Sequence, residues 1–298
     1  MTLASQQQQP QQPQQQQQQQ RADTLHRLHH DPRSPLVLVN AWDAASARLL
    51  QRAGAGVIAT TSAGMAWSLG YADGEQLPHA EFIAACARIC RVAGAEVPAS
   101  VDIERGYGQS LAEVCALVRT LIELGVVGIN IEDGVVPETR RLRPPHDMCE
   151  RIAALRLLAA ELDLRLFINA RTDVYFAAWD DPAGRFDAAL ERAQLFTAAG
   201  ADGIFVPGLD RLDEIDRFAR AIELPLNVYA GYPGVPDVAE LAAAGVRRIS
   251  LGCGPLQSAL GLLSRIADET FALGRYDTMT RGMASAGELN RLFSAAEA

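Results

Sequence analysis

The sequence lacks the features that mark membrane, secreted and nucleic-acid-binding proteins. It has no run of about 18 apolar residues, the length that a membrane-spanning helix needs, and no apolar leader at its start. Lys and Arg total 27 against 36 Asp and Glu, so the net charge is −9 and no general basic surface is available to neutralise phosphates. We therefore expect a cytoplasmic protein without a membrane or nucleic-acid partner.

Cysteine and aromatic residues are also sparse. There are five cysteines and no Cys-x-x-Cys pair, and an odd number without framework spacing favours a reducing compartment. Cys86 and Cys90 stand one helical turn apart in an apolar stretch, and we interpret the cysteines as buried core thiols. Aromatics make up 6% of the chain and hydrophobic residues 49%, so Ala, Leu, Val and Gly dominate, which suits small helices packed on a buried sheet.

The N-terminal segment is compositionally distinct from the rest of the chain. Residues 5–20 are almost wholly Gln with two Pro, and such a tract has no apolar surface to bury. We predict a disordered tail over 1–22 and a folded part that begins near Ser34. The remaining predicted units are a catalytic domain over 34–275 and a helical extension over 276–298.

Eight short apolar runs recur along the chain, each followed by an Ala- and Leu-rich segment with helical spacing. The runs are continuously apolar, as in parallel strands that are buried on both faces. Eight strand–helix units predict a (β/α)₈ TIM barrel; an open doubly wound sheet is the competitor, but no Gly-x-Gly-x-x-Gly follows the first strand. The predicted strands are 36–40, 56–61, 97–102, 127–131, 166–171, 203–207, 225–229 and 247–251, and the predicted helices 43–53, 79–93, 110–124, 147–161, 184–199, 211–220, 236–243, 255–272 and 284–296.

Acidic side chains follow two neighbouring strands at the mouth where a barrel carries its catalytic groups. Asp102 and Glu104 end the third strand, and Glu132 ends the fourth. Three carboxylates that converge repel each other unless a cation or protons intervene, and oxygen ligands without His or Cys select Mg²⁺ or Mn²⁺ over Zn²⁺. The sequence therefore predicts a metal site at these residues, with some of them acting through water.

Other polar residues near the same mouth have competing interpretations. Arg171, at the end of the fifth strand, presents a fork suited to a carboxylate or phosphate, which together with a metal indicates a small anionic substrate and a developing enolate oxygen. Asp133 and Asp173 can instead cap a helix or pair with Arg, and Asp43 can be a helix N-cap. Trp42 is either a packing residue or a substrate contact.

Four ordered motifs resemble those of the isocitrate lyase/phosphoenolpyruvate mutase superfamily over roughly residues 34 to 275. The run 101–108 (VDIERGYG) is similar to the Asp-x-Asp-x-Gly-(Tyr or Phe)-Gly motif, and 130–133 (NIED) to the strand-four Glu-Asp motif. The run 69–73 (LGYAD) is similar to the gating-loop segment, and 169–173 (NARTD) to the strand-five Ala-Arg motif.

This resemblance implies a Mg²⁺-binding α/β barrel whose helix after strand eight is exchanged between subunits of a homodimer or homotetramer. Asp102 would be the direct metal ligand, and Glu104 and Glu132 would hold the metal through waters. Asp73 would lie over the site and Arg171 would bind the anion. We accordingly expect catalytic roles for Asp73, Arg171 and Arg140, and substrate contacts from Thr61, Ser62, Ala63, Arg171, Trp42 and Asn227.

The chain departs from the family pattern in two places. Family lyases have Lys and Cys six and eight residues after the strand-four Glu, and phosphonopyruvate-handling members have Lys and Asn, whereas this chain has Glu138 and Arg140. We interpret 137–142 as a lid in which Arg140 or Arg141 contacts the substrate. After strand six, the run 205–209 (FVPGL) lacks the carboxylate that lyases use there.

These observations favour a Mg²⁺-dependent lyase or decarboxylase that cleaves a C–C bond of a small 2-hydroxy or 2-oxo dicarboxylic acid through a metal-bound enolate. One alternative is P–C chemistry of the phosphoenolpyruvate mutase or phosphonopyruvate hydrolase type. The other is a protein that binds a 2-oxo acid with little turnover, which the altered lid and the Gln-rich segment motivate.

Overall fold

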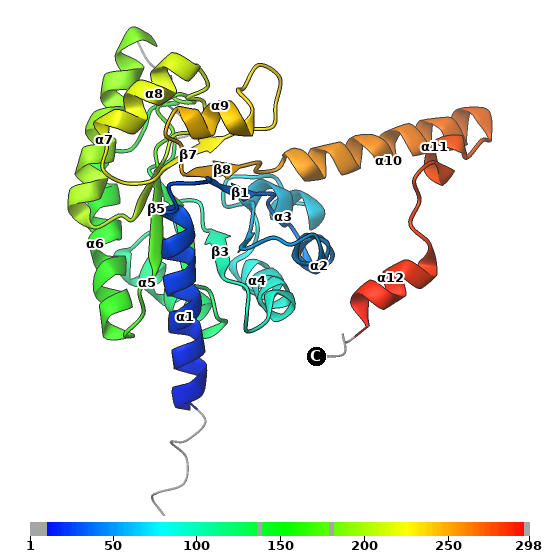
Figure 1. Cartoon of the computed structure of the whole chain (residues 1–298), viewed down its shortest axis with the longest axis horizontal. Coiled ribbons are helices and arrows are strands. Elements are labelled where there is room, and N and C mark those ends of the chain that lie inside the picture. Colours follow the sequence, from blue (N-terminus) through cyan, green and yellow to red (C-terminus); the bar gives the residue numbers. More distant parts are fainter. Residues whose placement is uncertain (1–10, 136–138, 179–181, 295–298) are drawn as a thin grey trace, which may run out of the picture.

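A computed structural model describes residues 11–135, 139–178 and 182–294 of the chain (Figure 1). Eight short strands and the helices between them alternate along the sequence. The strands are β1 Leu36–Leu38, β2 Ile58–Ala59, β3 Ala99–Asp102, β4 Gly128–Glu132, β5 Phe167–Arg171, β6 Gly203–Phe205, β7 Leu226–Tyr229 and β8 Arg248–Ser250. The helices are α1 Gln11–His29, α2 Ala44–Arg52, α3 Ser62–Ser68, α4 His79–Ala93, α5 Leu111–Glu123, α6 Pro145–Glu161, α7 Arg185–Ala199, α8 Leu212–Ala221, α9 Val238–Ala243, α10 Gly254–Leu273, α11 Asp277–Thr280 and α12 Ala286–Phe293, with a 3₁₀ turn over Pro182–Gly184.

The strands form one parallel sheet in the order β1-β8-β7-β6-β5-β4-β3-β2. The two outer strands meet through Ala41, whose N–H donates to Ala59 O at 2.7 Å and whose carbonyl accepts from Thr61 N at 3.1 Å. The sheet therefore closes on itself, and the predicted (β/α)₈ TIM barrel is confirmed.

The barrel helices form where the sequence supplies both an apolar stripe and a cap. In α5 the buried residues Val114, Leu117, Val118 and Leu121 recur at three- and four-residue spacing and pack against the sheet. Its N-cap Ser110 accepts from Glu113 N while Glu113 accepts from the Ser110 backbone. The predicted Asp43 N-cap is confirmed in the same way, because its side chain accepts from Ser46 N at the start of α2.

The interior of the barrel is unusually polar. Successive residues of a strand point to opposite faces, so Ile129 and Ile131 of β4 pack under the helices while Asn130 points inward. Asn169, Asn227 and Arg248 hold matching inward positions on other strands and are all buried. Large apolar side chains therefore fill the space between sheet and helices, and amides and a guanidinium fill the space inside the sheet.

The disordered tail predicted over residues 1–22 is wrong for the part that the structure describes. Residues 11–29 form α1, which covers the end of the barrel where the strands begin (Figure 1). Gln disfavours a core but is a good helix former, and Ala22, Leu25 and His29 lie on one buried stripe at helical spacing. Gln18 Nε2 also donates to Ile122 O at 2.7 Å, so the Gln-rich turn is itself attached to the barrel.

The C-terminal segment leaves the barrel. Helix α10 extends away from the strands and carries α11 and α12 with it (Figure 1). Several of its large apolar side chains are exposed, including Leu263 and Phe271, the latter at 88%. The exchange of this helix between subunits is an expectation that a single chain does not test. Within the described ranges, no helix is both long and apolar enough to cross a bilayer.

Candidate active site and metal centre

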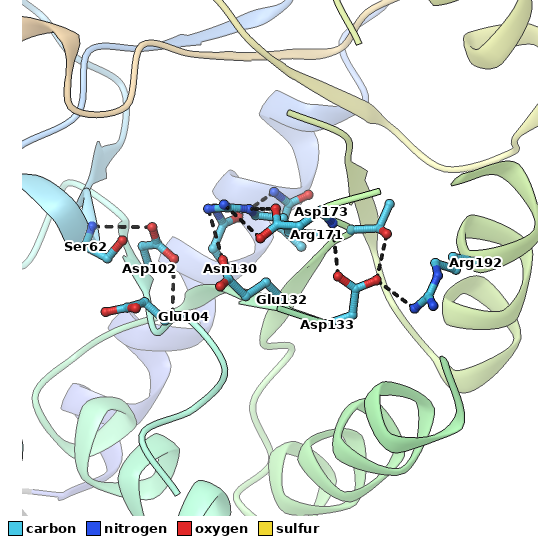
Figure 2. A network of polar contacts seen from close by, with 11 residues as sticks. Ser62, Asp102, Glu104, Asn130, Glu132, Asp133, Arg171, Asp173 and Arg192 are labelled. Atoms are coloured by element: carbon cyan, nitrogen blue, oxygen red, sulfur yellow. Dashed lines mark hydrogen bonds and ion pairs between the residues drawn. The ribbon is translucent and has the colours of Figure 1, made fainter. Parts of the chain in front are cut away.

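Asp102 stands at the centre of the catalytic mouth, at the last position of β3. Its Oδ2 accepts from Ser62 N at 3.4 Å and its Oδ1 from Glu104 N at 3.3 Å, while its own N–H donates to Thr60 Oγ1 at 2.9 Å (Figure 2). These three contacts come from the end of β2 and the loop after β3. The carboxylate is thus oriented before any ligand binds, although both of its acceptor contacts are long and leave lone pairs free.

Glu104 is held in a backbone conformation that a glutamate rarely adopts. Its φ is +49°, in the left-handed region, and its side chain is buried against Tyr107, whose hydroxyl donates to Oε1 at 2.9 Å. Burial first, and then the charges of Asp73 and Asp102, raise the pKa of Glu104 to about 8. Strained residues in a charged pocket are typical of functional sites, because the surrounding structure must compensate for the strain.

Glu132 and Arg171 form the second part of the charged cluster. Arg171 Nη1 lies 3.0 Å from Glu132 Oε2, and its Nε and Nη2 donate to Asp173 at 2.6 and 3.2 Å (Figure 2). Burial raises the pKa of Glu132 well above its usual range in spite of Arg171. Burial alone would lower the pKa of Arg171, but Asp173, Glu132 and Asp102 together raise it, so the guanidinium stays charged.

Asp133 is the structural residue that one interpretation of the sequence expected. Its carboxylate accepts from Arg192 Nη1 at 2.9 Å, from Thr172 Oγ1 at 2.7 Å and from Asp173 N at 3.0 Å (Figure 2). Burial raises its pKa to about 6 despite the ion pair. This pair ties α7 to the ends of β4 and β5, and so fixes the two strands that carry Glu132 and Arg171.

The donor chemistry suits a hard cation held mainly through waters. Asp102, Glu104 and Glu132 offer only oxygen ligands, and charge repulsion from Asp102 helps to raise the pKa values of Glu104 and Glu132. In the described part of the chain, no three His, Cys, Asp or Glu side chains are close enough together to hold one ion directly. The roles of Asp102, Glu104 and Glu132 as metal ligands therefore stay a prediction.

Two adjoining cavities open at this mouth and share Ser62, Asp73 and Arg171. The inner cavity, of about 220 Å³, is lined on the metal side by Asp102 and Asn130. The outer cavity, of about 410 Å³, is lined by the two remaining predicted metal ligands, Glu104 and Glu132, by Arg140 of the predicted lid and by Asp173. The inner cavity is the smaller of the two, and among the three predicted metal ligands only Asp102 lines it.

The far wall of the inner cavity carries a cysteine whose role the sequence interpretation missed. Cys253 follows β8 and begins α10, and its Sγ lies 3.9 Å from the Tyr229 hydroxyl. Burial and then the thiol raise the pKa of Tyr229 to about 12, so the phenol stays protonated. The interpretation as buried core thiols is confirmed for Cys86 and Cys90, whereas Cys115, Cys149 and Cys253 are half-buried, and Cys253 lines the cavity. Its place two residues after a predicted strand was the signal that could have found it.

The structure brings most of the predicted substrate residues together, but not all of them. Thr61, Ser62 and Ala63 line the inner cavity with Arg171, and Arg140 lines only the outer one. Trp42 and Asn227 line neither cavity. Trp42 packs beside Gly64 of α3, and Asn227 is buried beneath the cavity, where it accepts from Ser250 Oγ at 3.1 Å. Glu138 lies outside the described residues.

Comparisons with known proteins show the family of this chain. A family model described as phosphoenolpyruvate phosphomutase matches residues 25–271. A solved structure from Burkholderia cenocepacia J2315, described provisionally as a lyase/mutase, is 33% identical with a TM-score of 0.85 and covers 94% of this chain and 98% of its own. The 2-methylisocitrate lyase of Aeropyrum pernix is 32% identical over 204 residues, which are 66% of this chain and 61% of that protein. The oxaloacetate decarboxylase of Chromohalobacter salexigens is 33% identical over 183 residues, which are 58% of each.

The family model spans the whole barrel, from the last turns of α1 to α10. Its range includes every motif that carries the charged cluster, from the loop after β2 to the end of β5. The chain therefore belongs to the phosphoenolpyruvate phosphomutase family, within the isocitrate lyase/phosphoenolpyruvate mutase superfamily of lyases and mutases.

Proposed function

We propose that this enzyme is a Mg²⁺-dependent carbon–carbon lyase or decarboxylase acting on a small 2-hydroxy or 2-oxo dicarboxylic acid. The observation that carries the proposal is the division of the inner cavity into two unlike walls. Asp102 on β3 and Tyr229 on β7 line the same space from strands four places apart in an eight-stranded ring, and such strands face each other. The wall at Asp102 offers oxygen ligands for a cation, and the wall at Tyr229 and Cys253 offers groups that can donate a proton.

The metal wall would hold the cation through Asp102, with Glu104 and Glu132 acting through waters. Mg²⁺ is the favoured ion, with Mn²⁺ as the alternative, because all donors are hard oxygens. When bound, the ion would supply positive charge for the enolate oxygen that develops as the C–C bond breaks.

The substrate carboxylate would lie against Arg171 and the first residues of α3. Arg171 commits three N–H groups to Glu132 and Asp173, and a guanidinium has five, so two remain for a ligand. Thr61 and Ser62 add hydroxyl groups to the same side of the cavity. Asp73 is exposed on the loop between α3 and α4 and lines both cavities, so it would cover a bound substrate.

Cys253 would deliver the proton. In a decarboxylation, the bond between C3 and C4 breaks, CO₂ leaves, and the electron pair moves into the enolate. C3 then takes the proton of the Cys253 thiol, and the thiolate regains a proton from solvent. With the two oxygens of the substrate facing the metal wall, its C3 would point toward β7 and β8. Cys253 lies on that side of the cavity, where the Tyr229 Oη is 3.9 Å from the thiol.

We also propose that the working form is a homodimer or homotetramer. The extended α10 exposes Leu263 and Phe271, and at its end Leu273 is 66% exposed. Isolated exposed apolar residues are normal, but a row of them on a helix that projects from the barrel favours burial against a second copy. Sedimentation analysis of the full chain tests this directly, and a monomer would contradict it.

A substrate panel tests the reaction. Full-length protein with Mg²⁺ is offered oxaloacetate, 2-methylisocitrate, isocitrate, 2,3-dimethylmalate and phosphonopyruvate, and pyruvate, glyoxylate and phosphate are measured. Pyruvate above an Asp102→Ala control, without phosphate, is the expected result. Pyruvate from oxaloacetate alone would indicate a decarboxylase, whereas pyruvate from 2-methylisocitrate or 2,3-dimethylmalate, or glyoxylate from isocitrate, would indicate a lyase. Phosphate release would favour the P–C alternative, and oxalate binding without turnover of any compound would favour the binding-protein alternative.

A further inference from the structure

The inward side of β8 carries an arginine beneath the floor of the inner cavity. Arg248 is 2% exposed, and its three guanidinium nitrogens each face one neutral group. Nε lies 3.4 Å from Ser250 Oγ, Nη2 lies 3.4 Å from Asn130 Oδ1, and Nη1 lies 3.5 Å from His29 Nε2. In the described part of the chain, no carboxylate lies within ion-pair distance of it. The guanidinium is therefore buried without an ion pair, although the charge of Asp102 at the cavity still favours its protonated form.

Two of these partners are themselves walls of the substrate space. Asn130 and Ser250 both line the inner cavity, so the guanidinium sits one side chain below it. Asn130 Oδ1 also accepts from Asn169 at 2.5 Å, and Ser250 Oγ donates to Asn227 at 3.1 Å. The floor of the cavity is therefore a set of neutral polar groups whose orientation is fixed around one cation.

The third partner comes from the N-terminal helix. His29 Nδ1 lies 2.8 Å from Leu25 O, so this nitrogen carries the proton and Nε2 is the acceptor that faces Arg248. Its ring stacks on Phe167 at 3.9 Å, which seats α1 in the open end of the barrel. A neutral imidazole accepts a hydrogen bond without neutralising the guanidinium.

A buried charge with only neutral partners costs stability, and an apolar replacement of similar volume is often neutral or stabilising. A buried arginine of this kind is therefore expected where its positive charge serves the function of the protein. We propose that Arg248 is a positioning residue of the active site, which orients Asn130 and Ser250 and places positive charge beneath the bound anion, and that His29 of α1 holds it there. This inference rests on the proposed function, because it takes the ligand of the inner cavity to be a carboxylate.

The test uses oxalate, a small dicarboxylate, with Mg²⁺ and full-length protein in a calorimeter. Arg248→Met keeps the length of the side chain and removes the charge. We expect oxalate to bind about tenfold more weakly, which is the effect of losing one favourable charge contact. Arg248→Lys, which keeps the charge but not the fork, should recover part of the loss.

Arg156 provides a matched control at the same end of the barrel. It is partly buried, forms an ion pair with Asp202 and donates to Leu166 O and Gly200 O, but it reaches neither cavity. Arg156→Met should lower the thermal midpoint and leave oxalate affinity unchanged. A loss of affinity in both variants would show a general effect of barrel distortion and would overturn the inference.

A double variant that combines His29→Phe with Arg248→Met tests whether His29 acts through Arg248, and its thermal midpoint reports the effect on stability. His29→Phe preserves the stacking on Phe167 and removes the acceptor. It should weaken oxalate binding in the natural background and have no further effect in Arg248→Met, because it acts through Arg248. The combined variant should unfold at or above the natural midpoint, since both members of the polar contact are replaced by apolar groups.

These measurements separate the proposed function of the enzyme from the positioning role of Arg248. An unaltered protein that does not bind oxalate would contradict the proposed function, and in that case the thermal midpoints still test Arg248. A midpoint of the double variant several degrees below the natural one would show that Arg248 serves the fold. Oxalate binding that Arg248→Met leaves within twofold would contradict the positioning role alone.

Discussion

Arg171 and Glu132 are opposed across the β4–β5 register, and Arg171 Nη1 lies 3.0 Å from Glu132 Oε2. The pair has a consequence for the metal site. A carboxylate that already shares charge with a guanidinium is a weaker direct ligand than one without an ion pair. Asp102 has no ion-pair partner in the described residues, so it is the one expected to bind the cation directly.

The first prediction ranks the metal ligands. Asp102→Asn should abolish Mn²⁺ binding and reduce turnover by about 10³-fold, because the electrostatic contribution of the ion is lost with it. Glu132→Gln should weaken Mn²⁺ binding only moderately, because it acts through water. Electron paramagnetic resonance of free and bound Mn²⁺ measures both without an assay of turnover. Tight Mn²⁺ binding by Asp102→Asn would show that the direct ligand has been misassigned.

The second prediction concerns the proton donor. Cys253→Ala should lower kcat by about 10²-fold with little change in KM, which is the contribution expected of one general acid. Cys253→Ser, which keeps a donor at nearly the same place, should recover part of the rate. The control is Cys149→Ala, since Cys149 is half-buried and lines neither cavity. Equal activity of Cys253→Ala and the natural enzyme would exclude the thiol as the acid.

The third prediction concerns the support beneath the charged cluster. Arg192→Met leaves the Asp133 carboxylate buried without its cation, and we expect a loss of about 3 kcal/mol in the free energy of unfolding at neutral pH. Urea denaturation measures it. Arg220→Met breaks a comparable pair with Asp216 that lies on the exposed surface of α8, and it should leave the denaturation midpoint unchanged. A similar midpoint for both variants would mean that burial of Asp133 does not matter.

The fourth prediction is a pH dependence that comes from His29. Burial first, then Arg248, and also His26 and His30 hold the pKa of His29 well below its ordinary value of 6.5, although Leu25 O opposes the shift. Below pH 6.5 the His29 side chain therefore binds a proton in the unfolded chain but stays neutral in the folded protein. Stability from this group is fully present above pH 6.5 and is lost as the pH falls, by up to about 1.4 kcal/mol per pH unit.

His29→Phe removes that titration. Its unfolding free energy should therefore fall less steeply than that of the natural protein between pH 6.5 and 5. The difference between the unfolding free energies of the two proteins cancels the contributions of Glu104 and Asp133, which both proteins share. Their raised pKa values favour the folded state at low pH, the opposite trend. Parallel curves for the two proteins would contradict the assignment of a neutral, buried His29.

The regular parts of the barrel could be predicted well because their signals are local. The apolar run 127–131 predicts a strand, which the structure shows at 128–132, and the predicted helix 79–93 is observed as α4, because hydrophobic spacing reports burial directly. Helix α3 was missed, since seven residues are too few to show a period. Helix α1 was missed because its Gln tract hid the short stripe at Ala22, Leu25 and His29.

The sequence by itself determined the barrel, the family and the carboxylates that gather at the mouth of the barrel, because strand periodicity and ordered motifs are properties of neighbouring residues. Only the tertiary structure decided which groups share the cavity. It joins Asp102 to Cys253, about half the chain away, and sets His29 of α1 against Arg248 of β8. The physical reason is that closing the sheet opposes strands that are far apart in sequence, and no local pattern records which side chains then face each other.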